Sequence, residues 1–319
     1  MTDLKYKTIL SHVIIGILAI MFSGCTVPQP IPQPRLQEFS EAVSMTAENN
    51  MSAYTEIEKV HREVDVLKIT ADFDNKGFKP ESIKPFFDMQ ALKVRRQVLD
   101  GLCIYAEKLS ELAGEKQLED FDEETRKLGA SLQELNAGLM KSSFFRNSPV
   151  ESSQIQIFTT AVNAIGRWLI EYRRDRAIRE SIVGMDGNVH EICKLFVEDL
   201  GSPANGLYKN PGGLRAQQWN QYDELMILQD KFIGDNRNKL DPAVKKQEIE
   251  KLASYPARQK ESDAALADIQ SSFRKIREIH DALVKASGDG VRDYEAMVKK
   301  LISEGKRINK FYKGLGKDD

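Results

Sequence analysis

The residues with the clearest capacity for chemistry are a histidine and a cysteine three positions apart. His190 and Cys193, with Glu191 between them, lie in a segment with helical periodicity. Residues three apart share one face of a helix, so the two side chains could offer two metal ligands. A structural zinc site needs four ligands, and a catalytic one needs three and a water molecule. The sequence has no second pair at ligand spacing and no H-E-x-x-H motif, so we predict no metal site and no cofactor.

Two other histidines stand near acidic residues. His61 precedes Asp65 by four positions, and His280 is followed directly by Asp281. Adjacent residues of a helix point about 100° apart, so His280 and Asp281 do not form a ready-made catalytic dyad. His280 continues an apolar helical pattern, which predicts an interior histidine whose protonation depends on its surroundings.

One helical segment carries an unusual number of arginines. Guanidinium groups pair bidentately with phosphate or carboxylate oxygens, so the stretch could bind an anionic lipid or an acidic partner. Acidic residues are interleaved at helix-pair spacings and could neutralise the positive charge instead. Both alternatives stay open for Arg167, Arg173, Arg174, Arg176 and Arg179.

Several function classes lack their sequence signatures. The chain has no phosphate-binding G-x-x-x-x-G-K-[ST] loop, no dinucleotide-binding G-x-G-x-x-G after a strand, and no G-x-S-x-G nucleophile elbow. Its 46 basic and 48 acidic residues give a formal net charge of −2, which offers no strong field for nucleic acid. We therefore predict a protein that is not an enzyme and does not bind nucleic acid.

The N-terminus has the layout of a secretory signal peptide. Lys5 and Lys7 precede a mostly apolar run over residues 8–22, which ends in Ser23-Gly24-Cys25. A cysteine directly after small residues resembles the lipobox of bacterial lipoproteins, although Phe22 stands where leucine is usual. The resemblance covers residues 1–25 and implies that Cys25 is acylated and becomes the first mature residue. An uncleaved membrane anchor is the alternative, but the run has about fifteen residues and a span takes roughly twenty.

A proline-rich segment follows the lipidated position. Residues 25–35 hold four prolines, which favour an extended tether of about 3 Å per residue. Thr26 rather than aspartate follows Cys25, and by the sorting rule of enteric lipoproteins this implies the outer membrane, facing the periplasm. In an exported protein, Cys103 and Cys193 could form a disulfide. Both sit in apolar helical patterns, so two buried thiols are the alternative.

Helical periodicity dominates the mature chain and predicts an all-α fold. From residue 36 to 69, apolar positions alternate spacings of four and three, as packing of long helices requires. Thr46 and Asn50 interrupt this seam, and we interpret them as residues that fix the register. The seam consists of Phe39, Val43, Thr46, Asn50, Ala53, Ile57, Val60, Val64 and Leu67.

Residues that typically begin, end or interrupt helices divide the rest of the chain. Ser82 is expected to cap the second helix, and Asp241 and Pro242 to start another. Gly184 and Gly187 are expected to interrupt one helix, and Pro256 to break or kink a later one. The glycine-rich segment 201–213 is predicted to be a domain boundary or a hairpin loop at one end of a bundle. Further helices are predicted over 82–114, 118–141, 150–183, 189–200, 214–233, 258–286 and 291–312.

Together these features predict a signal peptide over 1–24, a lipidated tether over 25–35 and a helical domain over 36–319. We expect an elongated antiparallel bundle with long coiled-coil-like helices, whose terminal helices pair with each other or with a second copy. The predicted role is a non-catalytic envelope scaffold that docks a partner protein or associates with itself. The alternatives are a small molecule or metal held near Trp168, His190 and Trp219, and thirdly a hydrolase of envelope polymers.

Overall fold

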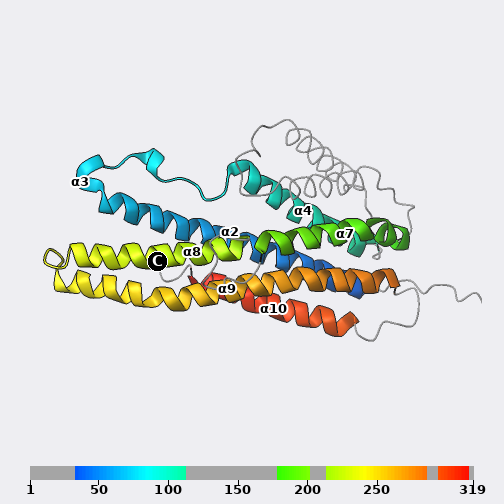
Figure 1. Ribbon diagram of the computed structural model, residues 1–319. Helices are drawn as coiled ribbons and strands as arrows, with labels where there is room; N and C mark the ends of the chain where they lie inside the picture. The colour runs from blue at the N-terminus through cyan, green and yellow to red at the C-terminus, as the bar shows by residue number, and fades with distance from the viewer. Residues whose placement is uncertain (1–32, 113–177, 202–212, 286–293, 316–319) are drawn as a thin grey trace, which may run out of the picture.

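The computed structural model describes residues 33–112, 178–201, 213–285 and 294–315. Within these ranges the chain forms α-helices and one short 3-10 turn without any β-strand, which confirms the all-α prediction. The long helices lie side by side along a common axis (Figure 1). No helix in this part of the chain is both long and apolar enough to cross a membrane.

The helices differ widely in length. A short helix, α3, and the 3-10 turn occupy the connection between the first two long helices. The elements are α2 (Gln33–Ala71), α3 (Phe73–Lys76), the turn Pro80–Ser82, α4 (Met89–Leu112), α7 (Ile178–Leu200), α8 (Leu214–Asp235), α9 (Pro242–Lys285) and α10 (Tyr294–Leu315). The start of α2 lies inside the predicted tether, because proline fits the first turn of a helix and Pro34 takes that place.

The 39-residue helix α2 lies at the centre of the bundle and contacts α4, α8, α9 and α10. Its predicted seam is buried from Phe39 to Val64, and Leu67 is half-buried. The polar seam residue Thr46 is 2% exposed and donates a hydrogen bond to the backbone oxygen of Ala42 at 2.8 Å. A polar residue is therefore accommodated without disturbing the apolar contact surface.

The two terminal helices of the described chain, α2 and α10, pack against each other within one molecule. Tyr294 donates a 2.6 Å hydrogen bond to the backbone oxygen of Arg35, and Asn49 donates one of 3.0 Å to that of Gly305. These contacts show that α2 and α10 run in the same direction. A Cβ atom on Gly305 would fall 2.4 Å from the sulfur of Met45, so glycine at this position permits α10 to approach α2 closely. Of the two predicted pairings, the structure shows the one that closes the monomer.

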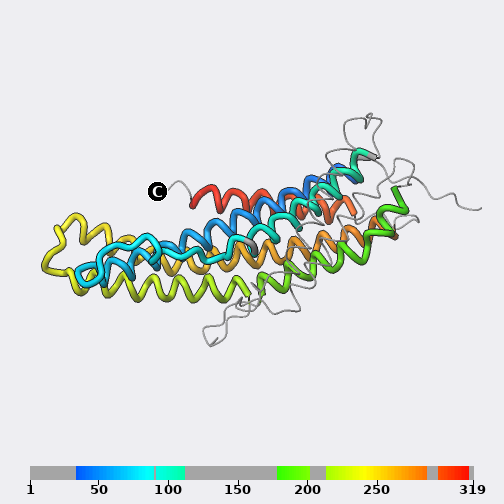
Figure 2. The backbone as a smooth tube through the Cα atoms, turned by 90° about the horizontal axis from the view of Figure 1, so that it is seen from above, coloured from blue at the N-terminus to red at the C-terminus, as the bar shows by residue number. Residues whose placement is uncertain are grey.

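Helices α7 and α8 follow one another along the same side of α9 and run opposite to it (Figure 2). They meet at Gly201 and Gly213, whose φ angles are 78° and 99°. A Cβ on Gly213 would lie 2.5 Å from the Cα of Gly201, so the two backbones touch. Gln270, in the middle of α9, donates a 2.7 Å hydrogen bond to the backbone oxygen of Gly201. The junction therefore lies part-way along the bundle and not at a hairpin end.

The predicted interruption of α7 and the predicted break of α9 at Pro256 are wrong. α7 runs unbroken through Gly184 and Gly187, which are both exposed, while residues such as Ile182 and Val189 bury its other face. α9 runs for 44 residues through Pro256, which is exposed between the buried Tyr255 and Gln259. Packing of the buried faces outweighs the local cost of glycine and proline, which is about 1 and 3 kcal/mol respectively.

The predicted start of α4 is also wrong, since the helix begins at Met89 and not at Ser82. A residue before proline is driven out of helical geometry, and Pro85 has this effect on the segment. Glu58 of α2 accepts hydrogen bonds from the backbone amides of residues 86 and 87 at 3.0 and 2.8 Å. Asp88 then caps α4 by accepting the amide of Ala91 at 3.3 Å.

The predicted start of α9 is confirmed. Asp241 accepts the backbone amide hydrogen of Ala243 at 2.8 Å, and Pro242 is the first residue of the helix. The side chain of Asp241 thus satisfies one of the amides that a helix start leaves without a partner.

Replacing Gly184 with alanine is expected to raise the free energy of unfolding by about 0.5–1 kcal/mol, because glycine in a helix interior loses more backbone entropy. The added Cβ meets nothing within 4 Å. Urea unfolding measures the change. Gly213→Ala is the matched control and should destabilise, since its φ is 99° and its Cβ would collide with Gly201. A stabilising Gly213→Ala, or a destabilising Gly184→Ala, would contradict this account of the two glycines.

Candidate functional site

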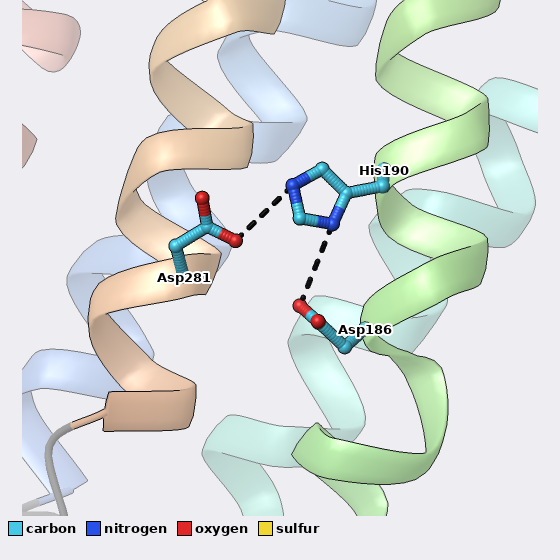
Figure 3. Close-up of side chains that lie close together, drawn as sticks. All are labelled: Asp186, His190 and Asp281. Carbon is cyan, nitrogen blue, oxygen red and sulfur yellow. Dashed lines mark ion pairs between the residues drawn. The ribbon is translucent and has the colours of Figure 1, made fainter.

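Three titratable side chains meet where α7 and α9 face each other (Figure 3). Nδ1 of His190 lies 3.7 Å from a carboxylate oxygen of Asp186, and Nε2 lies 3.1 Å from one of Asp281. The imidazole thus stands between the two carboxylates. Its side chain is 23% exposed and those of the two aspartates 33% and 32%, so water and small ions can reach the group.

The packing of α7 against α9 explains why these residues come together. Asp186 and His190 are four apart and so share one side of α7, where they lie next to the buried Met185 and Val189. On α9, Asp281 follows the buried His280. The cluster therefore forms along the edge of an apolar interface, where polar side chains keep partial access to water.

A series of hydrogen bonds leads from the cluster into the core. The hydroxyl of Tyr105 on α4 lies 2.8 Å from Nε2 of His280, and Nδ1 of His280 lies 3.1 Å from the Asp186 carboxylate. A carboxylate can only accept, so Nδ1 of His280 donates and its Nε2 accepts from the tyrosine. Burial lowers the pKa of His280 below its ordinary value, and the neutral ring fits this pattern.

The structure separates the two residues that the sequence had suggested as metal ligands. Cys193 is 1% exposed and belongs to the apolar core, whereas His190 points to the edge of the interface. The residues that join His190 are Asp186 and Asp281, which sequence reasoning had not selected. The spacing of Asp186 and His190 was a visible signal, but nothing local linked them to Asp281.

Cys103 and Cys193 are free thiols in the structure. Cys193 is buried, and Cys103 is partly buried and packs against the same core. Burial raises the pKa of each thiol to about 12. Of the two sequence-based alternatives, the structure shows separate thiols of low reactivity and not a bridge.

Most other predicted site residues lie outside the described ranges. They include the lipidation site Cys25 and the arginines 167, 173, 174 and 176, as well as Trp168. Arg179 is exposed in the first turn of α7. Trp219 is half-buried on α8, on the other side of the 201–213 junction from His190.

A second polar network is sealed inside the bundle. Arg95 of α4 and Asp199 of α7 form a two-pronged ion pair in which both side chains are 6% exposed, with Nε of Arg95 2.9 Å from the carboxylate. Tyr54 of α2 donates a 3.3 Å hydrogen bond to the same carboxylate. The Arg95 guanidinium also lies 5.6 Å from the ring centre of Phe87. This network joins three helices, and its burial marks it as structural.

Asp199→Ala is expected to cost about 3–5 kcal/mol of unfolding free energy, because it leaves the Arg95 charge buried without its carboxylate. The double variant Arg95→Met with Asp199→Leu should recover most of the loss. Urea denaturation followed by circular dichroism measures both. Glu250→Ala is the control. It removes the ion pair between Glu250 and Lys246, whose side chains are 66% and 76% exposed, and it should leave the urea midpoint unchanged. An equal effect of Asp199→Ala and Glu250→Ala would contradict a structural role for the buried pair.

No family model, curated protein or solved structure matches this chain. Two arrangements within the described residues distinguish this bundle. One is the half-buried His190 cluster, and the other is the distribution of exposed apolar side chains along the bundle.

Proposed function

We propose that this protein is a lipid-anchored, non-catalytic docking protein of the bacterial envelope. In this proposal the mature chain is an elongated bundle of coiled-coil-like helices, antiparallel except where α2 and α10 run in the same direction, and it binds a partner at its far end. The observation that carries the proposal is the concentration of exposed large apolar side chains at the end of the bundle opposite to the start of α2.

The geometry of α2 sets the distance between the two ends. Its first residue, Gln33, follows the proposed lipidation site Cys25 closely in the sequence. Thirty-nine helical residues at 1.5 Å each extend about 58 Å. The end of α2 is thus held well away from the proposed anchor, at the same end as α3 and the turn between α8 and α9 (Figure 1).

The exposed apolar residues favour that far end. Among the described residues, six of the eight large apolar side chains that are exposed belong to the last turns of α2, to the connection after it, or to the parts of α8 and α9 near their turn. Single exposed apolar residues are ordinary, but their concentration in one region is typical of an interaction surface. These six, here called the tip residues, are Val66, Phe73, Phe78, Ile227, Val244 and Ile249.

The long helices also suit docking. Helices that lie side by side present extended surfaces onto which a partner helix can be added. A non-catalytic role agrees with the lack of recognised catalytic motifs in the sequence. The nearly balanced charge favours a partner held by apolar contacts over one attracted by a strong field.

Charged substitutions at the tip should abolish partner binding without unfolding the bundle. Phe78 and Ile227 are 55% and 69% exposed, so Phe78→Asp and Ile227→Asp remove apolar contact area and leave the core intact. The measurement is photo-crosslinking in intact cells, followed by affinity purification from the solubilised membranes. Val183→Asp is the matched control, since Val183 is 52% exposed on α7, outside the tip. Loss of the same crosslinked partner in the control, or its retention in both tip variants, would refute docking at the tip.

The anchor can be tested separately. Cys25→Ser should prevent acylation and move the protein from the membrane fraction to the soluble fraction, because a thioether-linked lipid cannot form on serine. Fractionation followed by immunoblotting measures the shift, and Cys103→Ser is the control that retains the proposed lipidation site. A Cys25→Ser protein that stays with the membrane would show an uncleaved anchor instead.

A further inference from the structure

We propose that the outward face of α10 binds the surface of an anionic lipid bilayer. The inference rests on the lipid anchor of the proposed function, which keeps the bundle beside a membrane, and it adds how the bundle lies on that membrane. It concerns a surface that is separate from the tip residues. The side chains of this surface, here called the basic face, are Lys299, Lys300, Lys306, Arg307, Lys310 and Lys313.

The buried and the basic residues of α10 occupy opposite sides of the helix. Val298, Leu301 and Ile308 are buried, and α10 packs against α2 and α9. Spacings of three and seven keep these three residues on one side, so the residues between them point outward. All six members of the basic face are exposed. Since α10 lies at an edge of the bundle (Figure 1), a flat surface can reach this face.

The charge of α10 is opposite in sign to that of the whole chain. Six basic and two acidic residues give α10 a charge of +4, whereas the chain has a formal net charge of −2. Lys299 pairs with Glu295 at 3.8 Å, Arg307 pairs with Asp268 at 2.6 Å, and Glu304 pairs with a lysine of α9. Within the described ranges, the members of the basic face that form no ion pair are Lys300, Lys306, Lys310 and Lys313.

The residue types suit a bilayer better than an acidic protein. Five of the six basic side chains are lysines, whose ammonium groups are flexible point charges. Recognition of individual carboxylates favours arginine, which binds them with two parallel hydrogen bonds. The 22 residues of α10 form a row about 33 Å long, which matches an extended anionic surface. None of the exposed large apolar side chains of the described residues belongs to α10, so the binding is electrostatic and without insertion.

The start of α10 lies close to the proposed anchor. Tyr294 donates its hydrogen bond to the backbone oxygen of Arg35, near the start of α2. Gln33 follows Cys25 by eight positions, a length of chain that reaches at most about 28 Å. A lipid on Cys25 therefore holds the basic face within reach of the headgroups. With this face on the bilayer, the axis of the bundle lies along the membrane.

Amine labelling of the full chain, purified with its lipid and reconstituted into vesicles, tests the proposal. One set of vesicles is phosphatidylcholine alone, and the other also contains phosphatidylglycerol. On the anionic vesicles Lys306, Lys310 and Lys313 should label at least about fivefold more slowly, which is the factor that one basic residue contributes near an anionic surface. Mass spectrometry measures the rates. High salt should remove the protection, because it screens the charges.

A variant without three of the unpaired charges tests the cause of the protection. The triple variant Lys306→Gln, Lys310→Gln and Lys313→Gln keeps Lys300, whose labelling reports on the same face. In this variant Lys300 should label on anionic vesicles at the rate seen on neutral ones. The three side chains are exposed, so their replacement leaves the core intact, and circular dichroism checks the fold.

Three exposed lysines at the other end of the bundle provide the matched control. They are Lys239, Lys246 and Lys251. Their labelling should be equal on both kinds of vesicle, and replacing all three by glutamine should leave the protection of α10 unchanged. Equal labelling of the basic face on neutral and anionic vesicles, or protection that survives in the α10 triple variant, would overturn the proposal. Stronger protection by added polyglutamate than by anionic vesicles would also overturn it, in favour of an acidic protein partner.

Flotation of the vesicles separates this proposal from the anchor. Protein that floats with both kinds of vesicle has a membrane anchor, and the labelling then decides the basic face alone. Protein that floats with anionic vesicles only would refute the anchor and support the basic face. Protein that floats with neither would refute both.

Discussion

The whole bundle depends on one constraint, which is that α2 must bury an apolar face along almost its entire length. Leu36 is fully buried near its start and Val64 near its end. Several helices share the task of covering this face. α4 and α10 pack against the first part of α2, and α8 packs against the second part. α9 contributes to both groups of buried side chains, and the arrangement of the other helices follows from this division.

Polar contacts inside the bundle define how the helices line up. Arg95 and Asp199 join α4 to α7, with Tyr54 of α2 at the same carboxylate. Asn49 fixes the position of α10 along the axis of α2 through its hydrogen bond to the backbone oxygen of Gly305. Apolar surfaces slide past each other at little cost, whereas a buried polar group left without its partner costs about 1–3 kcal/mol. These contacts therefore specify one register among several that the apolar seams would allow.

The His190 cluster is a consequence of that register. α9 packs against α7 so that His280 enters the core and the neighbouring Asp281 stays at the rim. At the rim the three side chains keep contact with water, while the helices fix the position of their backbone.

The sequence by itself determined the helical class, the seam of α2 and the start of α9 at Asp241, because periodicity and caps are local properties of the chain. It wrongly predicted an interruption at Gly184 and Gly187, and Pro256 does not end its helix, since burial of one helix face outweighs local propensity. Only the tertiary structure decided that Asp281 meets His190, and that Cys193 does not join it. The register between α7 and α9 comes from contacts between residues about 90 positions apart, and no local pattern encodes it.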